Sequence, residues 1–318
     1  MPSDASKPAG GVRHIAIDPA FAEQRIDNFL LRELKGVPRS LVYRLLRKGQ
    51  VRVNGGRIKA EYRLKAGDSV RLPPVRVAGA GEPVEPPQNM VERVERAILF
   101  EDPDLIIVNK PSGLAVHGGS GVPYGLVDIL RRLRPRAKGL ELAHRLDRGT
   151  SGCIVVAKKR SSLRYLHGLF RDGHVEKHYL TLLGGQLPKG AVPVEAALRR
   201  VRDGSGEHRV LAGAQGKPSR TVFRTVRRFR GFTLAEAALE TGRMHQIRVH
   251  AASLGHPVAG DEKYGDEGIN ERLRALGLKR IFLHASRLSF TGPQGQSLAV
   301  EAPLDDMLQG LLDRLEAL

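Results

Sequence analysis

The residues best suited to chemistry in this chain surround one carboxylate, Asp147. It stands between Arg145 and Arg148, just before a Gly/Thr/Ser stretch, and apolar residues flank this loop at 140–142 and 154–156. A carboxylate beside cations can serve as a nucleophile or a general base, because an opposite charge nearby favours its ionised form. An Asp at a corner between two strands more often only shapes a turn. These residues by themselves leave both interpretations open.

Three histidines and a glycine-rich loop are further candidates for a site. His245, His250 and His256 are five and six residues apart, which matches neither HExxH nor a zinc-finger pair, so we expect no metal site. Residues 117–121 lack the GxGxxG spacing and fit a plain turn as well as a phosphate loop. Cys153 is the only cysteine and is expected to be buried and inert. No nicotinamide, S-adenosylmethionine or GxxxxGK[ST] signature is present, so the chemistry is expected to use side chains without a cofactor.

The composition predicts a polyanionic partner. The 318 residues include 52 Lys and Arg against 34 Asp and Glu, a formal net charge of +18 that is spread along the chain. Such a charge favours nucleic acid, whose phosphates Lys and Arg neutralise, and an acidic membrane is the competing partner. Residues 1–11 lack an apolar signal core, and no apolar run reaches the roughly 18 residues that a membrane span needs. We therefore expect a cytoplasmic protein with no membrane partner.

Two helices and a hairpin are predicted near the N-terminus. Residues 24–34 carry apolar side chains at helical spacing, and Ser40 is placed to cap a second helix over 41–48. The tight-turn signal at 54–56 follows a short alternating segment, and Ile58 is expected to begin the return strand.

This helix–helix–hairpin segment is rich in cations. Between residues 39 and 71 there are ten Lys and Arg and only two acids, Glu61 and Asp68. One interpretation is a solvated basic face, and the sharper one is a docking surface for a phosphate backbone. The side chains expected to contact RNA are Arg39, Arg44, Arg47, Lys48, Arg52 and Lys59.

A Pro- and Gly-containing stretch at 73–87 has little apolar periodicity and indicates a linker. Beyond it, strand-like runs mix with helical ones, which predicts an α+β domain instead of regular βα alternation. The strand-like runs are 104–109, 152–157, 178–184, 221–229, 232–239 and 281–284, and the clearest helices are 124–133 and 161–170. The expected organisation is a flexible N-terminus (1–22), a small α/β RNA-binding domain (23–80), a linker (81–96) and a catalytic domain (97–318).

Several strings resemble those of one enzyme family. Residues 144–152 spell HRLDxxTSG, 176–180 contain K-x-Y, and 241–250 spell TGRMHQIRVH, with NKPSG at 109–113. Together they resemble the large-subunit rRNA pseudouridine synthases. Residues 23–72 resemble the RNA-binding domain first seen in ribosomal protein S4. The resemblance implies a catalytic domain built on a mixed, mainly antiparallel sheet with flanking helices.

The resemblance also implies roles for single residues. Asp147 would be the nucleophile or base that cleaves the bond between ribose and uracil, and Arg248 would pair with it. Tyr179 would stack on the uracil and assist proton transfer, and Arg145 would displace the flipped base. The product is an isomer of the substrate, so no cofactor and no metal are needed. Contacts to phosphate or to the active-site loop are expected from Arg243, His245 and Gln246.

The implied partner is 23S ribosomal RNA or a large-subunit precursor. Within the family, the strings at 35–40 and 115–121 are similar to members that modify three uridines of that RNA. The alternatives are a synthase with a different rRNA site and a non-catalytic rRNA-binding or ribosome-assembly protein. A methyltransferase or a tRNA synthetase with the same N-terminal domain is disfavoured, because their nucleotide-binding signatures are missing.

Overall fold

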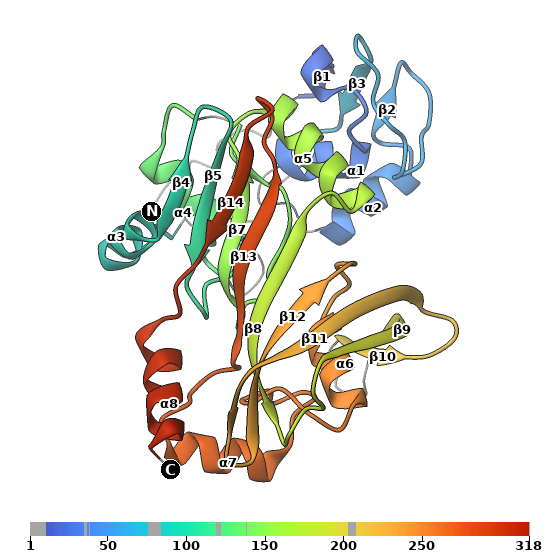
Figure 1. Cartoon of the computed structure of the whole chain (residues 1–318). Coiled ribbons are helices and arrows are strands. Elements are labelled where there is room, and N and C mark those ends of the chain that lie inside the picture. The colour runs from blue at the N-terminus through green and yellow to red at the C-terminus, as the bar shows by residue number, and fades with distance from the viewer. Residues whose placement is uncertain are drawn as a thin grey trace, which may run out of the picture. The chain divides into compact units, whose positions relative to one another are not determined.

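The computed structural model (Figure 1) describes residues 11–34, 37, 39–75, 84–118, 122–137, 139–202 and 208–317. The chain divides into two compact units, Met1–Val84 and Glu85–Leu318, and each is described by itself. Among the described residues, no helix is long and apolar enough to cross a membrane.

The first unit combines two helices with a small antiparallel sheet of order β1-β3-β2. Apolar residues at helical spacing, such as Phe29, Leu30 and Leu45, turn inward and meet Val53 and Val70 from the sheet. This burial closes a separate hydrophobic core, and each such side chain contributes roughly 1.5–3 kcal/mol. The elements are β1 (Arg13–Ala16), η1 (Pro19–Phe21), α1 (Ile26–Glu33), α2 (Arg39–Arg47), β2 (Arg52–Val53) and β3 (Ser69–Leu72).

Some local predictions for this unit need correction. Residues 13–16, expected to be flexible, form β1 because they pair with β3. Helix α2 begins at Arg39, so Ser40 lies inside it and is not its cap. The residues after the turn at Asn54 and Gly55 form no return strand at Ile58, and β2 pairs with β3 instead.

Asp68 explains why the return strand does not directly follow the turn at Asn54 and Gly55. Its buried carboxylate accepts hydrogen bonds from Asn54 Nδ2 (2.8 Å), Tyr62 Oη (3.0 Å) and the Lys65 backbone N–H (2.8 Å). These bonds fold the intervening residues into a loop, so the return strand starts only at Ser69.

The second unit is built on an eleven-stranded sheet of order β10-β9-β11-β12-β8-β13-β7-β5-β4, with β14 on β13 and β6 on β7. Its described strand pairs are antiparallel except that β13 runs parallel to β7. The strands are β4 (Ile98–Glu101), β5 (Leu105–Lys110), β6 (Glu141–Leu142), β7 (Ser151–Ala157), β8 (Glu176–Gly184), β9 (Ala191–Arg202), β10 (His208–Ala212), β11 (Lys217–Phe229), β12 (Phe232–Leu239), β13 (Leu283–Thr291) and β14 (Ser297–Glu301). The mixed, mainly antiparallel sheet expected from the family resemblance is therefore confirmed.

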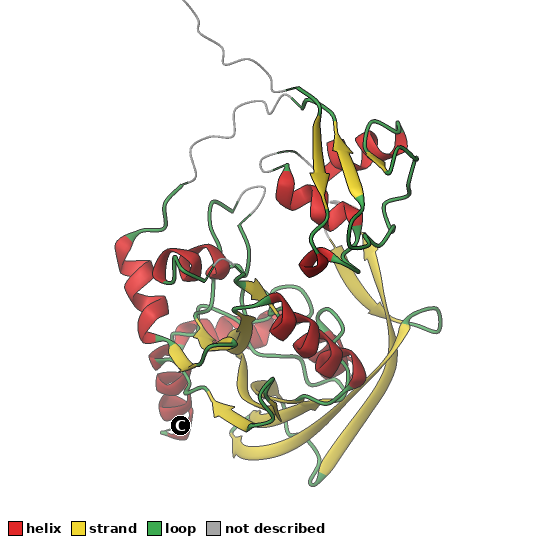
Figure 2. Ribbon diagram, turned by 90° about the horizontal axis from the view of Figure 1, so that it is seen from above, coloured by secondary structure: helices red, strands yellow, loops and turns green. Residues whose placement is uncertain are grey.

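Helices cover both faces of this sheet (Figure 2). Side chains alternate along β5, so Ile106 and Val108 pack with helices α3 and α4, while Leu105 and Ile107 pack with α5. Helices α7 and α8 cover a further cluster at β8 and β12. The helices are α3 (Gln88–Arg96), α4 (Leu126–Leu133), α5 (Arg160–Asp172), α6 (Gln246–Ser253), α7 (Glu267–Ala275) and α8 (Asp306–Glu316).

Helix α3 corrects the predicted linker at 81–96. Residues 88–96 form this helix, and its Val91 and Val94 are buried against the sheet. The sequence did not reveal this helix because its amphipathic pattern is only nine residues long and directly follows a Pro-rich stretch.

Candidate active site

The three motifs meet because of the order of the strands. Strand β8, which carries Tyr179, lies between β12 and β13, and β13 in turn lies beside β7. Tyr179 is opposite Ala285 on β13, and Ala285 is opposite Gly152 on β7. The loop with Asp147 enters β7, and helix α6 with Arg248 follows β12. Residues far apart in the chain are thereby placed around one point.

Gly152 allows this close approach of β7 to β13. Its φ is +108°, a conformation that side-chain-bearing residues rarely adopt, and an added Cβ would collide with the backbone of Ala285. The glycine of the HRLDxxTSG string is therefore required by packing.

The side chain of Lys110 and the turn at 111–114 support the Asp147 loop. The buried ammonium group of Lys110 donates to the carbonyls of Pro111 (3.0 Å), Leu114 (2.9 Å) and Arg148 (3.3 Å). Burial and the charge of Arg280 lower the pKa of Lys110, Asp147 acts in the opposite direction, and the net pKa is about 7. The NKPSG string, noted in the sequence without a role, thus supports the Asp147 loop.

Arg280 also supports this loop. Its guanidinium donates to Ser151 Oγ (2.9 Å) and to Asp305 (2.8 Å), and Ser151 Oγ also lies 2.8 Å from His284 Nδ1. Thr150 and Ser151 are buried at the point where this loop enters β7.

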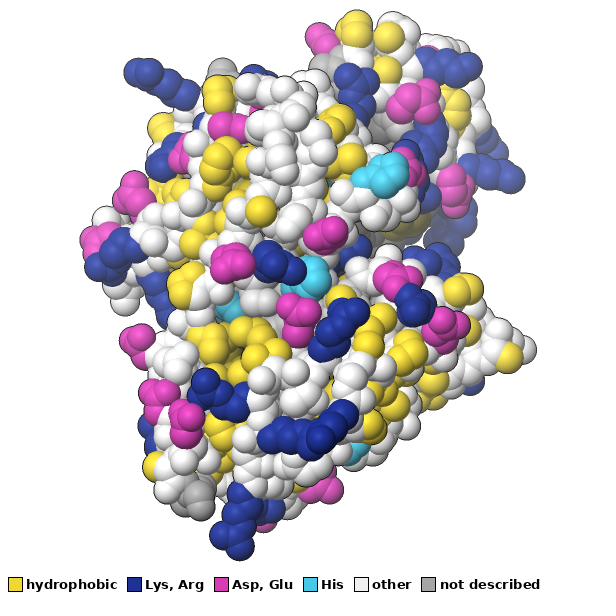
Figure 3. All heavy atoms as spheres, in the orientation of Figure 1, with side chains coloured by type: hydrophobic (Ala, Val, Ile, Leu, Met, Phe, Trp, Pro, Cys, Tyr) yellow, Lys and Arg dark blue, Asp and Glu magenta, His cyan; other side chains and the backbone are white. Residues whose placement is uncertain are grey.

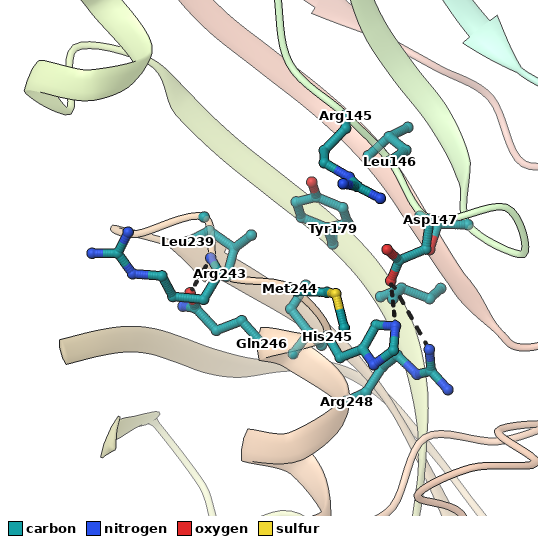
Figure 4. A pocket seen from close by; sticks show the side chains of 14 residues that line it. Arg145, Leu146, Asp147, Tyr179, Leu239, Arg243, Met244, His245, Gln246 and Arg248 are labelled. Carbon is teal, nitrogen blue, oxygen red and sulfur yellow. Dashed lines mark hydrogen bonds and ion pairs between the residues drawn. The ribbon is translucent and has the colours of Figure 1, made fainter. Parts of the chain in front are cut away.

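One pocket gathers the predicted residues (Figure 4). The carboxylate of Asp147, about a quarter exposed, points into it. The pocket is lined by Arg145, Leu146, Asp147, Thr150, Tyr179, Leu239, Gly242, Arg243, Met244, His245, Gln246, Ile247, Arg248 and Leu283. Asp147, Tyr179, Arg248, Arg145 and the 243–246 segment are therefore brought together as neighbours.

Arg248 lies between two carboxylates. Its Nη1 is 3.9 Å from Asp147 Oδ2, but its Nε and Nη2 each donate to Asp261 at 2.7 Å. The shorter, bidentate pair is thus with Asp261, a residue that no sequence signal singled out. Asp261 lies in the 260–265 segment, after the helix that carries Arg248. No periodicity of the sequence there indicates a partner for Arg248.

Asp261 fixes Arg248 firmly because its own side chain is fully buried. Burial raises the pKa of this carboxyl, but Arg248 and the backbone N–H groups of Lys263 and Tyr264 outweigh that effect, so the net pKa is lowered. The pKa of Arg248 is raised in turn, because Asp261 and Asp147 outweigh its burial. Arg248 therefore stays charged and keeps one end directed at Asp147.

Tyr179 forms a wall of the pocket. Its side chain is buried on β8, and burial together with the charge of Asp147 raises the pKa of its hydroxyl. The ring thus remains a neutral phenol with its proton in place.

The three residues expected to contact phosphate or the loop separate in role. Arg243 lines the pocket and is exposed. Gln246 is 2% exposed and uses both ends of its amide, accepting from Thr241 Oγ1 (2.7 Å) and donating to Thr221 Oγ1 (3.0 Å). The amide of Gln246 is thus engaged within the chain at the first residue of α6, and its expected contact with RNA or with the active-site loop stays a prediction. His245 lies 3.6 Å from Asp147.

The basic side chains of the first unit are placed differently. Arg44, Arg47, Lys48, Arg52 and Lys59 are exposed, and none forms an ion pair with another described residue. Lys and Arg side chains project from the surface of this unit in Figure 3. The Arg39 side chain and residues 35, 36, 38 and 119–121 lie outside the described residues.

Comparisons with known proteins agree with the fold. The RNA pseudouridylate synthase model matches residues 104–253, and the S4 domain model matches residues 24–70. The solved structure of human RNA pseudouridylate synthase domain containing 4 superposes with a TM-score of 0.60 at 26% identity, covering 72% of this chain and 96% of that one. For domain containing 1 the values are 0.56, 27%, 74% and 98%.

Curated relatives align with nearly the whole chain. Ribosomal large subunit pseudouridine synthase C of Pasteurella multocida is 51% identical, covering 96% of this chain and 94% of the relative. The protein of that name from Escherichia coli (strain K12) is 49% identical, covering 96% and 97%. The chain therefore belongs to the RNA pseudouridylate synthase family. It is a pseudouridine synthase with an N-terminal S4 domain, and its full-length relatives carry the name synthase C.

Proposed function

We propose that this enzyme isomerises specific uridines of 23S ribosomal RNA, or of a large-subunit precursor, to pseudouridine with Asp147 as the essential residue. The observation that carries the proposal is that Asp147, Tyr179 and Arg248 line one pocket in a chain whose relatives are named for the large ribosomal subunit. The rival interpretation as a non-catalytic RNA-binding protein loses its support, because the chain belongs to an enzyme family and keeps these residues. The cytoplasmic location expected from the sequence stays part of the proposal.

The reaction exchanges one bond to the ribose for another. The bond between uracil N1 and ribose C1′ breaks, the base turns, and a bond forms between C5 and C1′. The proton on C5 leaves and N1 gains one, so atoms and charge balance without a redox partner. Asp147 attacks the sugar or removes a ribose proton, and both routes need the ionised carboxylate that Arg248 favours.

The other pocket residues hold the base during this exchange. The target uridine must leave its stack, which costs a few kcal/mol, and the flat guanidinium of Arg145 is suited to take its place. Tyr179 offers an aromatic face to the detached uracil and a neutral hydroxyl for proton transfer.

The test uses Asp147→Asn, which keeps the volume but removes the charge. The substrate is 23S rRNA transcribed with uridine tritiated at carbon 5, and tritium release into water reports isomerisation. We expect a loss of about 10³-fold or more with rRNA binding intact. The matched control is Asp172→Asn on the exposed end of α5, which should leave release unchanged.

Full release by Asp147→Asn would remove this residue from the reaction. Sequencing of pseudouridines in rRNA from cells lacking the gene identifies the modified positions. If no 23S position is lost there, the substrate is wrong, whatever the Asp147 result.

A further inference from the structure

His245 has a backbone that is unusual for its residue type. Its φ of +55° lies in the left-handed region, where residues with side chains are uncommon, and it is the N-cap residue of helix α6. Its side chain is only 13% exposed. It lies between the Asp147 loop and the residues that follow Asp261. Strain of this kind persists only where surrounding contacts over-determine the conformation.

Both ring nitrogens of His245 have neighbours of opposite kinds. Nδ1 lies 2.8 Å from Tyr264 Oη, and Nε2 lies 3.6 Å from Asp147 Oδ2. The rings of His245 and Tyr264 also meet edge to face, with centroids 5.5 Å apart. The imidazole is thus fixed at one end and directed at the catalytic carboxylate at the other, as Figure 4 shows for His245 and Asp147.

The hydrogen-bond partners of Tyr264 decide where the proton of His245 resides. Tyr264 Oη accepts a hydrogen bond from the backbone N–H of Val210 at 2.8 Å. Its own proton then needs an acceptor, and among the described residues the one within reach is His245 Nδ1. With Nδ1 accepting, a neutral imidazole carries its proton on Nε2, facing Asp147.

Strand order makes the Val210 N–H available. Strand β10 pairs with β9 and stands at the end of the sheet order, so it has no second neighbour among the described strands. Val210 itself is buried with Leu198 and Val249, which docks the edge strand against helix α6. The backbone donor is therefore held in place by packing.

We propose that His245 is a positioning residue for Asp147, with its Nε2–H tautomer selected by the chain Val210 N–H to Tyr264 Oη to His245 Nδ1. This role rests on the proposed function of Asp147. The Nε2–H group and Arg248 Nη1 both approach Oδ2 of Asp147, at 3.6 and 3.9 Å. No described residue donates to Oδ1, so in this proposal Oδ1 is the oxygen available to the ribose.

The present separation is longer than a hydrogen bond. Catalytic contacts of this length commonly shorten when the substrate binds. A neutral donor suits this place better than a second cation, because Arg248 already supplies the positive charge. Burial and Arg248 lower the pKa of His245, and Asp147 acts in the opposite direction, which keeps the ring neutral near pH 7.

Two substitutions separate the reach of the side chain from its backbone. Asn tolerates the left-handed conformation but is too short to reach Asp147, whereas Gln places an N–H near the position of Nε2. We expect His245→Asn to lower kcat for tritium release about 10²-fold with KM nearly unchanged, and His245→Gln to recover at least about tenfold of it. His167→Asn, on the exposed side of α5, is the matched control and should retain the parent kcat.

The tautomer itself is measured without any reaction. In protein labelled with ¹⁵N-histidine, the resonances of His245 are those that disappear in His245→Gln, and their shifts distinguish Nδ1–H from Nε2–H. We expect Nε2–H in the parent chain and a mixture of tautomers in Tyr264→Phe, which keeps the ring but removes the hydroxyl. Because this measurement needs no substrate, it stands even if 23S rRNA proves to be the wrong RNA.

The pH profile gives a further readout. The charged or titratable groups that face His245 are Asp147, Arg248, Asp261, Lys263 and Tyr264. Protonation of Nδ1 would place two protons between His245 and Tyr264 Oη. Because the pKa of His245 is lowered, kcat should fall on the acid side only below the ordinary pKa of an imidazole, and His245→Gln should lose this limb. An Nδ1–H tautomer in the parent chain, or an undiminished kcat in His245→Asn, overturns the proposal.

Discussion

Arginine and lysine side chains differ in burial and in ion pairing between the two units. In the catalytic unit Lys110 is buried and donates to three carbonyls, and Arg248, with a side chain 14% exposed, donates to Asp261 through two nitrogens. In the first unit Arg44, Arg47 and Lys48 are exposed and form no ion pair with a described residue. Buried cations give geometry, since their removal leaves a partner unsatisfied, whereas exposed cations give attraction over distance that salt screens.

The largest effect on stability and on activity is expected when Arg248 is replaced. Arg248→Ala leaves Asp261 buried and unpaired, so we expect the free energy of unfolding to fall by about 3–5 kcal/mol and tritium release to be lost. Denaturant titration measures the stability. Arg171→Ala, which removes the exposed pair with Asp172, should leave the unfolding midpoint unchanged. A similar loss in both variants would mean that burial does not distinguish the two kinds of pair.

Lys110 offers a pH test of the same idea. Its pKa is lowered by burial to about 7 in the folded chain and is about 10.4 when unfolded, so between these values the unfolded state binds more protons. The free energy of unfolding should therefore rise with pH from about 7 to 10, by up to about 1.4 kcal/mol per unit.

The control for this slope is Lys110→Met, in which that contribution should vanish. The substitution also frees the carbonyl of Arg148, so we expect kcat to fall by about 10²-fold. Parallel pH–stability curves for the two proteins would contradict the lowered pKa of Lys110.

The smallest effect on the fold is expected on the exposed side of the comparison. Replacing Arg44, Arg47 and Lys48 by Gln should change the free energy of unfolding by no more than about 0.5 kcal/mol. The dependence of rRNA affinity on salt should become less steep, by roughly 0.7–0.9 in the log–log slope for each lost phosphate contact. Filter binding at several salt concentrations checks this, with Arg227, Arg274 and Arg314 replaced together as the control. An unchanged slope would favour the solvated basic face over the docking surface.

Much of the local structure followed from the sequence. Alternating and helical apolar patterns predicted β5, β7, β8, β11, β12, α4 and α5 to within a few residues, because these periods are local properties. The motif residues Asp147, Tyr179 and Arg248 were identified by family resemblance, and the structure places them in one pocket. Elements with weaker signals, such as α3 and β1, were misassigned because each depends on packing against a distant partner.

The tertiary structure alone decided which side chains face one another. The sequence by itself determined the residue types of the site and that the chain carries a basic N-terminal unit. Only the order β12-β8-β13-β7, with its parallel step, brings Tyr179 beside the Asp147 loop. Only folding reveals that Arg248 binds Asp261 and that Gln246 is buried. The physical reason is that a side chain's partner depends on contacts between strands and helices far apart in the chain, which no local period encodes.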